Sequence, residues 1–196
     1  MSEGKLLALR RIRGTAEELS DRALVSALAE GDQAALGALY DRFSADVHRF
    51  ITRLVRDEAS DDLTQQTFLE AYRSAPRFRG EAAVKTWLFG IAINQVRHHV
   101  RGELRRKTAT AKLEVMPQAP SPSAPEVIAL EQQRRWLAIA IDRLAPSLRE
   151  AYVLCVIEEM QGKDAAQVLG IREASLWRRL SDARTALRGL LAEVQR

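Results

Sequence analysis

The sequence predicts an all-α protein made of two small helical domains that are joined by a proline-rich, flexible linker. Apolar residues recur every three to four positions through most of the chain, and no segment alternates apolar and polar residues as a strand does. Four of the six prolines fall in the segment MPQAPSPSAPE, residues 116–126, whose composition favours extended chain over a packed core. We therefore expect one domain at 15–112, the linker at 113–126 and a second domain at 127–196.

The composition predicts a soluble, cytoplasmic protein. Of the 196 residues, 46% are hydrophobic, which is enough for a core, and 29% are charged, with a net charge of +4. The single cysteine, Cys155, excludes a disulfide within the chain, and its apolar neighbours favour a buried thiol. The sequence has no secretory signal, and no uncharged apolar run approaches the roughly 20 residues of a membrane span.

The first half of the N-terminal domain is expected to hold three helical segments. Gly31 and Asp32 interrupt the first apolar run, and residues 45–55 form a second segment with one apolar face. A third segment begins near Ser60, ahead of a carboxylate-rich first turn, and ends at Pro76. The apolar positions that share a face in the first run are Leu24, Leu28, Ala35, Leu39 and Phe43.

A loop at 78–86 leads into the segment WLFGIAINQVRHHVR, residues 87–101, which changes character along its length. Its first ten residues carry no charge, and the basic residues Arg97, His98, His99 and Arg101 then follow. This pattern predicts a helix that is buried at its apolar end and exposed at its basic end. The two histidines are either weak phosphate contacts or neutral, solvent-facing side chains. Neighbours about 100° apart on a helix are poorly placed to share a metal ion.

The C-terminal domain is expected to hold a first helix that ends before Pro146, a second at 149–160, and two more that divide at Gly170. Leu130, Leu137, Ile141 and Leu144 form the apolar stripe of the first of these helices.

The last two helices carry the spacing of a helix-turn-helix. Ala166 is small enough for a close helix crossing, Gly170 tolerates the turn, and Leu176 buries the second helix. Between residues 171 and 190, five arginines stand against two acidic residues, an excess of three. We interpret this second helix as one that reads DNA in the major groove, the alternative being an ordinary solvated helix. Trp177 is expected either in the core or against the DNA backbone.

The segment DEASDDLTQQTFLEAY, residues 57–72, is strongly acidic. Carboxylates repel phosphate, so this helix suits a basic protein partner, and pairing of its carboxylates with arginines would fix how the partner aligns on the helix. The alternative is a solvated helix face. The acidic residues and the two glutamines among them are Asp57, Glu58, Asp61, Asp62, Gln65, Gln66 and Glu70.

Taken in order, DDLTQQTFLEAY, then KTWLFGIAINQVRHHVR, then LAPSLREAYVLCVIEEMQGKDAAQVLGIREASLWRRL resemble a known family. The chain resembles bacterial RNA polymerase sigma factors of the sigma-70 family, in the extracytoplasmic-function (ECF) subgroup. Members of this subgroup keep only the second and fourth conserved sigma regions. The resemblance covers residues 20–110 and 127–192, and implies sigma region 2 at 15–112 and sigma region 4 at 127–196.

The resemblance implies an alternative sigma factor that binds core RNA polymerase and directs promoter-specific transcription initiation. It implies no catalysis by this chain, no cofactor and no bound metal. It also implies an anti-sigma factor as partner, in many cases membrane-anchored. The implied polymerase-binding residues are Asp62, Gln65, Gln66, Phe68 and Tyr72. The implied contacts to the minus-ten DNA are Lys85, Asn94, Arg97, His98, Arg101 and Arg105. The implied contacts to the minus-thirty-five DNA are Arg172, Ser175, Trp177, Arg178, Arg179 and Arg184.

The chain departs from the family pattern around the helix-turn-helix. Gln161 and Gly162 stand where an apolar–aromatic pair is usual, Ala165 replaces a bulky aliphatic residue, and Trp177 replaces a polar or basic one. Two other functions compete with the sigma factor. A stand-alone repressor would use the same motif as a dimer, but gives no role to the acidic segment. An enzyme is discounted, because the sequence has no glycine-rich phosphate loop, metal-ligand spacing or nucleophile–base set.

Overall fold

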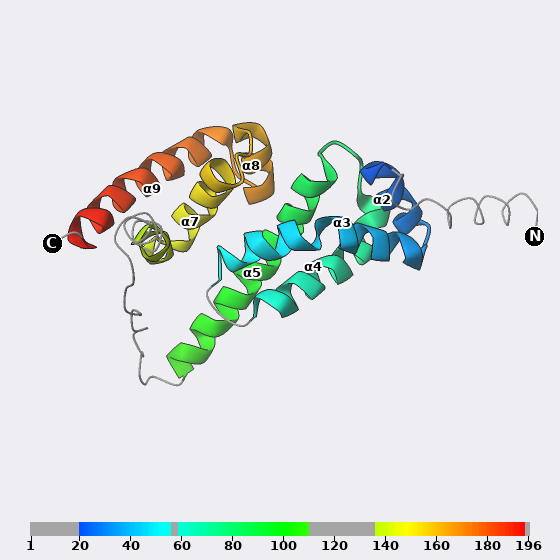
Figure 1. The fold of residues 1–196 in the computed structure, drawn as a ribbon, viewed down its shortest axis with the longest axis horizontal. Coiled ribbons are helices and arrows are strands. Elements are labelled where there is room, and N and C mark those ends of the chain that lie inside the picture. The colour runs from blue at the N-terminus through cyan, green and yellow to red at the C-terminus, as the bar shows by residue number, and fades with distance from the viewer. Residues whose placement is uncertain (1–19, 56–58, 110–135, 195–196) are drawn as a thin grey trace, which may run out of the picture. The chain divides into compact units, whose positions relative to one another are not determined.

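The computed structural model describes residues 20–55, 59–109 and 136–194, and the chain divides into two compact units, one up to Val96 and one from Arg97. Within these described ranges every element is helical and none is a strand, which confirms the predicted all-α class (Figure 1). The predicted linker at 113–126 lies outside the described residues, as do Asp57 and Glu58 of the predicted acidic helix.

The first unit begins with α2 (Asp21–Ala29) and α3 (Gln33–Thr52), which meet at the predicted break. Gly31 takes up a φ of 90°, in the left-handed region that glycine tolerates best. The side chain of Asp32 then caps α3 by accepting a hydrogen bond of 2.8 Å from the amide of Ala34. The apolar pattern predicted two segments within 33–52. The structure has one helix there, because residues 44–46, between the two apolar runs, include neither glycine nor proline.

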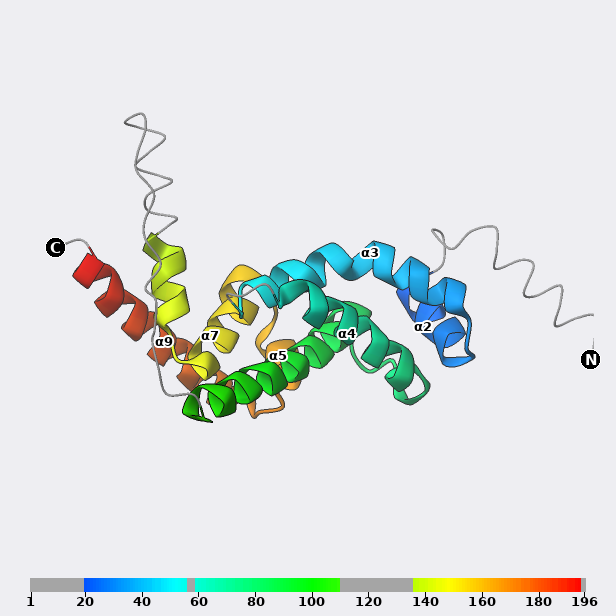
Figure 2. The ribbon, with the colours of Figure 1, turned by 90° about the horizontal axis from the view of Figure 1, so that it is seen from below.

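The next elements are α4 (Ser60–Ser74), the 3₁₀ turn η1 (Ala75–Arg77) and α5 (Val84–Ala109), of which the residues up to Val96 belong to this unit. Helix α4 packs along α3 (Figures 1 and 2). Ala59, not Ser60, is the cap residue of α4, and its own side chain makes no capping hydrogen bond. Pro76 lies inside η1, so α4 ends two residues before it.

The core of the first unit is built on the apolar part of α5. Phe89 and Phe50 of α3 are both fully buried, and their rings stack with centroids 4.2 Å apart and planes 3° apart. The predicted buried end of the segment 87–101 is confirmed for most of its apolar side chains. The buried residues of α5 are Val84, Thr86, Leu88, Phe89, Ile91, Ala92, Ile93 and Val96.

In the second unit, a helix at 136–143 leads to α7 (Pro146–Tyr152), the π-helical turn η2 (Val153–Ile157), α8 (Gly162–Leu169) and α9 (Glu173–Val194). One helix was predicted at 149–160, whereas the structure has a short α-helix that widens into η2. Cys155 lies in this turn and is only partly buried, and that burial raises the pKa of its thiol.

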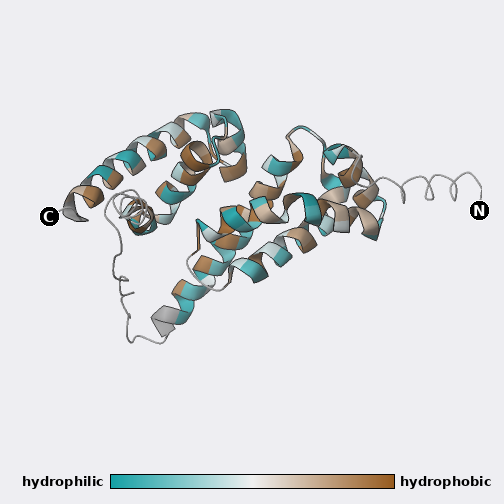
Figure 3. Ribbon diagram, viewed as in Figure 1, coloured by the Kyte–Doolittle hydropathy of each residue, from teal (hydrophilic) through white to brown (hydrophobic). Residues whose placement is uncertain are grey.

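The helix-turn-helix forms where it was predicted. Gly170 ends α8 in the left-handed conformation, with a φ of 66°, and the amide of Ile171 reaches back to the carbonyl of Ala166. Apolar and polar residues recur along α9 at the helical repeat (Figure 3). Its buried stripe consists of Leu176, Leu180, Ala183 and Leu187.

Arg149 of α7 supports the end of the helix at 136–143. Its guanidinium donates hydrogen bonds to the carbonyls of Ile141, at 3.2 Å, and Leu144, at 3.4 Å.

Candidate protein and nucleic-acid interfaces

The predicted protein-binding residues of α4 form one exposed surface, which we call the α4 surface. It arises because the buried stripe of α4 leaves the other side of the helix open. Leu69 is 53% exposed among these polar neighbours, and no pattern in the sequence singles it out. Leu69 and the exposed Tyr72 are three positions apart and so share a helix face, and such a pair within a polar surface suits a protein interface. The α4 surface consists of Asp62, Gln65, Gln66, Leu69 and Tyr72.

Phe68 differs from the other residues predicted on α4. Only 3% of it is exposed, and its ring centroid lies 4.9 Å from that of Tyr40 on α3. Phe68 therefore packs beneath the α4 surface and has no side-chain atoms to offer a partner. Tyr40 is 40% exposed above it, and extends the α4 surface onto α3. No local pattern marks Tyr40, because its position depends on how the two helices pack.

Lys85, predicted to contact DNA phosphate, is held by an acidic neighbour at the start of α5. Its Nζ lies 2.9 Å from Oδ2 of Asp46 and 5.3 Å from the centroid of the Phe89 ring. Asp46 also pairs with Arg49. The hydrogen bond from Lys85 holds the pKa of the Asp46 carboxyl below its ordinary value of 3.8, although burial opposes this shift. A phosphate contact by Lys85 would have to share its ammonium group with Asp46.

This ion pair makes stability depend on pH. We expect Asp46→Asn to lower the free energy of unfolding near neutral pH by up to ~1 kcal/mol, since the pair is partly exposed. Because the folded pKa of Asp46 is lowered, its contribution is present above the unfolded pKa and is lost as the pH falls through the folded value. Urea unfolding across the acid range should therefore show the difference shrinking below about pH 4.

The control is Asp41→Asn, which removes an exposed carboxylate from the same helix and should change stability by less than ~0.5 kcal/mol. A deficit of Asp46→Asn that stayed the same at every pH would mean that packing, and not charge, is lost.

The basic end of α5 presents a single polar stripe. Asn94, His98, Arg101 and Arg105 are all exposed and follow one another at intervals of four, three and four residues. That spacing places them on one face of a helix. Within the part of the chain that the structure describes, this is the predicted minus-ten set without Lys85 and Arg97. The stripe can meet a nucleic-acid backbone with Arg101 and Arg105 and hydrogen-bond a base with Asn94.

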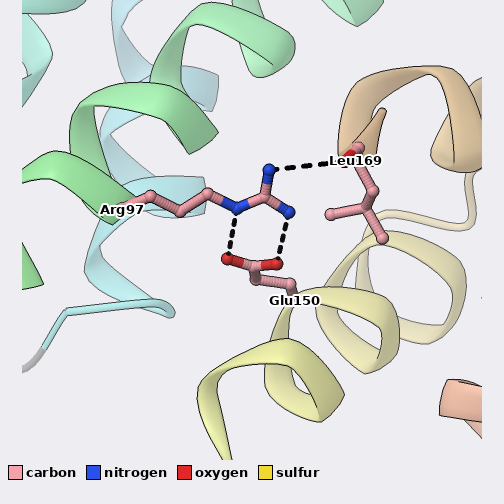
Figure 4. A network of polar contacts seen from close by, with 3 residues as sticks. All are labelled: Arg97, Glu150 and Leu169. Atoms are coloured by element: carbon pink, nitrogen blue, oxygen red, sulfur yellow. Dashed lines mark hydrogen bonds and ion pairs between the residues drawn. The ribbon is translucent and has the colours of Figure 1, made fainter. Parts of the chain in front are cut away.

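Arg97 does not belong to this stripe, because its side chain points toward Glu150 and Leu169 (Figure 4). In the second unit, its Nε and one terminal nitrogen donate to the two carboxylate oxygens of Glu150, at 2.9 and 2.7 Å. Its other terminal nitrogen donates to the carbonyl of Leu169 at 3.3 Å. Glu150 is only 6% exposed, so its charge requires such a partner. The hydrogen bond with Glu150 raises the pKa of the Arg97 guanidinium. In this arrangement Arg97 is engaged, and a DNA contact by Arg97 stays a prediction.

The residues predicted to contact the minus-thirty-five DNA lie between Arg172, just before α9, and Arg184, halfway along that helix. In the first turn of α9, Leu176 is fully buried and anchors the helix, while its neighbours face outward. Trp177 is 49% exposed, so it is neither a core residue nor a fully solvated one. Arg179 is partly buried. The remaining residues of the predicted set are exposed, and they are Arg172, Ser175, Arg178 and Arg184.

Two kinds of site are not found among the residues that the structure describes. No group of three or more histidine, cysteine, aspartate or glutamate side chains could hold a metal ion there. No helix in those ranges is long and apolar enough to cross a membrane.

Comparison with known proteins agrees with this geometry. The family described as Sigma-70 region 2 matches residues 39–106, which include the α4 surface and the polar stripe of α5. The family described as Sigma-70, region 4 matches residues 134–187, which include the helix-turn-helix. Together the two regions span more than half of the chain, in the order found in sigma factors. The chain belongs to the sigma-70 family.

Similar curated proteins place this sigma factor in the ECF group. It is 40% identical over 91 residues to the ECF RNA polymerase sigma-E factor of Haemophilus influenzae, which is 46% of this chain and 48% of that protein. It is 27% identical over 179 residues to the protein of the same name from Salmonella typhimurium, which is 87% of this chain and 94% of that protein.

A solved structure of CnrH in complex with the cytosolic domain of CnrY is similar in fold. The TM-score is 0.63, with 27% sequence identity over 88% of this chain and 97% of that one. The two-domain sigma architecture expected from the sequence is thus confirmed. The comparisons match whole regions, and the roles of individual residues in this sigma factor stay predictions.

Proposed function

We propose that this ECF sigma factor binds core RNA polymerase through the α4 surface and directs the polymerase to its promoters. The polar stripe of α5 reads and holds the minus-ten DNA, and the start of α9 reads the minus-thirty-five DNA. The observation that supports this most directly is that most of the side chains concerned are exposed to solvent. Of the residues predicted to bind polymerase or DNA, those of α4, α5 and α9 lie on open helix faces, except for Phe68 and the partly buried Lys85, Arg97 and Arg179.

The separation of charge along the chain supports this division of labour. The α4 surface contains Asp62 and no cation, which suits a basic patch on a protein and opposes contact with phosphate. The α5 stripe contains Arg101, Arg105 and His98, which suit DNA. One chain that binds a protein through one helix and DNA through two others is what promoter-directed initiation requires.

The proposal extends to domains and partners. Sigma region 2 occupies 15–112, the linker 113–126 and sigma region 4 127–196, so that the linker spans polymerase between the two promoter elements. The chain acts in the cytoplasm without cofactor or catalytic activity of its own, since bond formation belongs to the polymerase. An anti-sigma factor is a further proposed partner, because CnrH, which has a similar fold, is bound to the cytosolic domain of CnrY.

The test is co-elution of the full chain with bacterial core RNA polymerase on a sizing column at moderate salt, followed by run-off transcription. A one-to-one complex that starts transcription at defined promoters is the expected result. No complex, together with a dimer that binds palindromic DNA by itself, would overturn the proposal in favour of a stand-alone repressor.

The α5 stripe gives a second, quantitative test. Arg101→Gln should weaken binding of the polymerase complex to promoter DNA at all promoters alike. It should also reduce the slope of log affinity against log salt by about 0.9, the value for one lost phosphate contact. The control is Arg22→Gln, an exposed arginine of α2 outside the proposed DNA surface, which should leave the slope unchanged. A normal slope for Arg101→Gln would exclude a phosphate contact at this position.

A further inference from the structure

Gly162, the first residue of α8, lies directly against Trp177 of α9. A Cβ atom built on Gly162 would come within 2.4 Å of Cζ2 of Trp177 and 2.8 Å of Oε1 of Glu173. The backbone does not require glycine here, because Gly162 is not among the residues with a left-handed φ. Most residues would suit the first turn of a helix better than glycine. The indole ring of Trp177, with the Glu173 carboxylate beside it, therefore leaves no room for a side chain at position 162.

The same ring is open on its other side. Trp177 follows the fully buried Leu176 and is 49% exposed, so one part of the indole rests on the start of α8 and the rest faces outward. A tryptophan has only two side-chain torsions, and here the α8 backbone restricts them further. A ring held in this way loses little conformational freedom when it binds. Trp177 thus forms a fixed apolar plate at the start of α9, next to the exposed Arg178.

The chemistry of this plate indicates what it contacts. An indole is uncharged and donates a single hydrogen bond, so it is a poor partner for phosphate, which the neighbouring Arg178 is better suited to bind. In the major groove the one apolar group that a base pair displays is the C5-methyl group of thymine. We propose that Trp177, braced by Gly162, is a specificity-determining residue that selects thymine in the minus-thirty-five element. This inference rests on the proposed function, in which α9 enters that groove.

The first experiment removes only the methyl group from DNA. Polymerase reconstituted with the full chain selects its preferred sequences from duplexes that are randomised over the minus-thirty-five element. Each thymine of the selected duplex is then replaced by deoxyuridine. We expect one position at which this replacement weakens binding about fourfold, which is the effect of one buried methyl group.

The second step joins this effect to the side chain. In Trp177→Ala, deoxyuridine and thymine should bind equally at that position, and the slope of affinity against salt should not change, because no phosphate contact is lost. The tryptophan is half exposed, so this variant leaves the buried stripe of α9 intact.

Gly162→Ala tests whether the contact of Gly162 with the indole ring is needed, while the tryptophan itself is kept. The added methyl group must displace the indole, so the preference for thymine should fall by at least half in free-energy terms while the phosphate contacts remain. The matched control is Gly189→Ala, which adds the same methyl group to α9 at a site with nothing within 4 Å. Gly189→Ala should keep the full preference, and circular dichroism checks that both variants are folded.

The outcomes separate the inference from the function on which it rests. If the wild-type complex selects a minus-thirty-five sequence but no thymine is sensitive to deoxyuridine, the proposed role of Trp177 is overturned and the function stands. The same holds if Trp177→Ala keeps the sensitivity, or if it weakens all sequences alike, as a backbone contact would. If the wild-type complex has no sequence preference at minus thirty-five, the proposed function of α9 itself fails.

Discussion

Asp62→Arg is expected to abolish the complex with core polymerase on a sizing column and to weaken binding in titrations by at least ~30-fold. Asp62 is exposed on the α4 surface, in the first turn of that helix. A basic partner that pairs with this carboxylate would instead meet a like charge and lose its hydrogen bond. Such changes in protein interfaces cost about 2 to 5 kcal/mol.

The control for this variant must change the charge equally. Glu30→Arg does so at an exposed position after α2, outside the α4 surface, and should bind polymerase normally. Loss of the negative charge near the start of α4 also removes a favourable interaction with the helix dipole, worth about 0.3 to 1 kcal/mol. Thermal unfolding measures that loss separately. Asp62→Arg that still bound polymerase with wild-type affinity would remove α4 from the proposed interface.

Phe89→Ala is expected to have the largest effect on stability, lowering the free energy of unfolding of the first unit by about 3 to 5 kcal/mol. Phe89 is fully buried and stacks on Phe50, so truncation removes both the ring contact and the apolar burial that hold α5 against α3. Urea unfolding can be followed through Trp87, whose ring centroid lies 4.8 Å from that of Phe78 in the same unit.

Leu104→Ala is the matched control, because it truncates an apolar residue of the same helix that is 64% exposed. It should change stability by no more than ~0.5 kcal/mol. A comparable loss in both variants would show that α5 contributes through helix formation and not through the packing of Phe89.

Most of the fold could be predicted because its signals are local. Each of these signals depends on a few neighbouring residues: the helical spacing of apolar residues, the break at Gly31 and the turn at Gly170. The structure has them where they were expected. The length of α3 was underestimated, because a drop in apolar content at 44–46 is not a helix breaker. The π turn after α7 was missed, since the apolar residues of VLCVI fit an ordinary α-helical turn equally well.

The candidate site was predictable only in part, because contacts between distant residues decide the rest. The acidic helix and the arginines were evident from charge alone. The sequence did not predict the contact of Lys85 with Asp46 or that of Arg97 with Glu150. The partners are 39 and 53 residues apart in the chain, and only the fold brings them together. The ambiguity of Trp177 has the same origin. Its half-exposed position depends on a glycine fifteen residues earlier, whose meaning is clear only when α8 and α9 are packed together.

The π turn at Val153–Ile157 has a consequence for how this chain tolerates change. A π turn holds one residue more than an α-helical turn, so it behaves as an insertion that the helix absorbed without breaking. Deleting one residue from VLCVI would therefore restore an ordinary α-helical turn, and α8 and α9 would still follow it in much the same direction. This segment is thus a place where the chain tolerates a change of length by one residue, because the turn, and not the helix-turn-helix, takes up the difference.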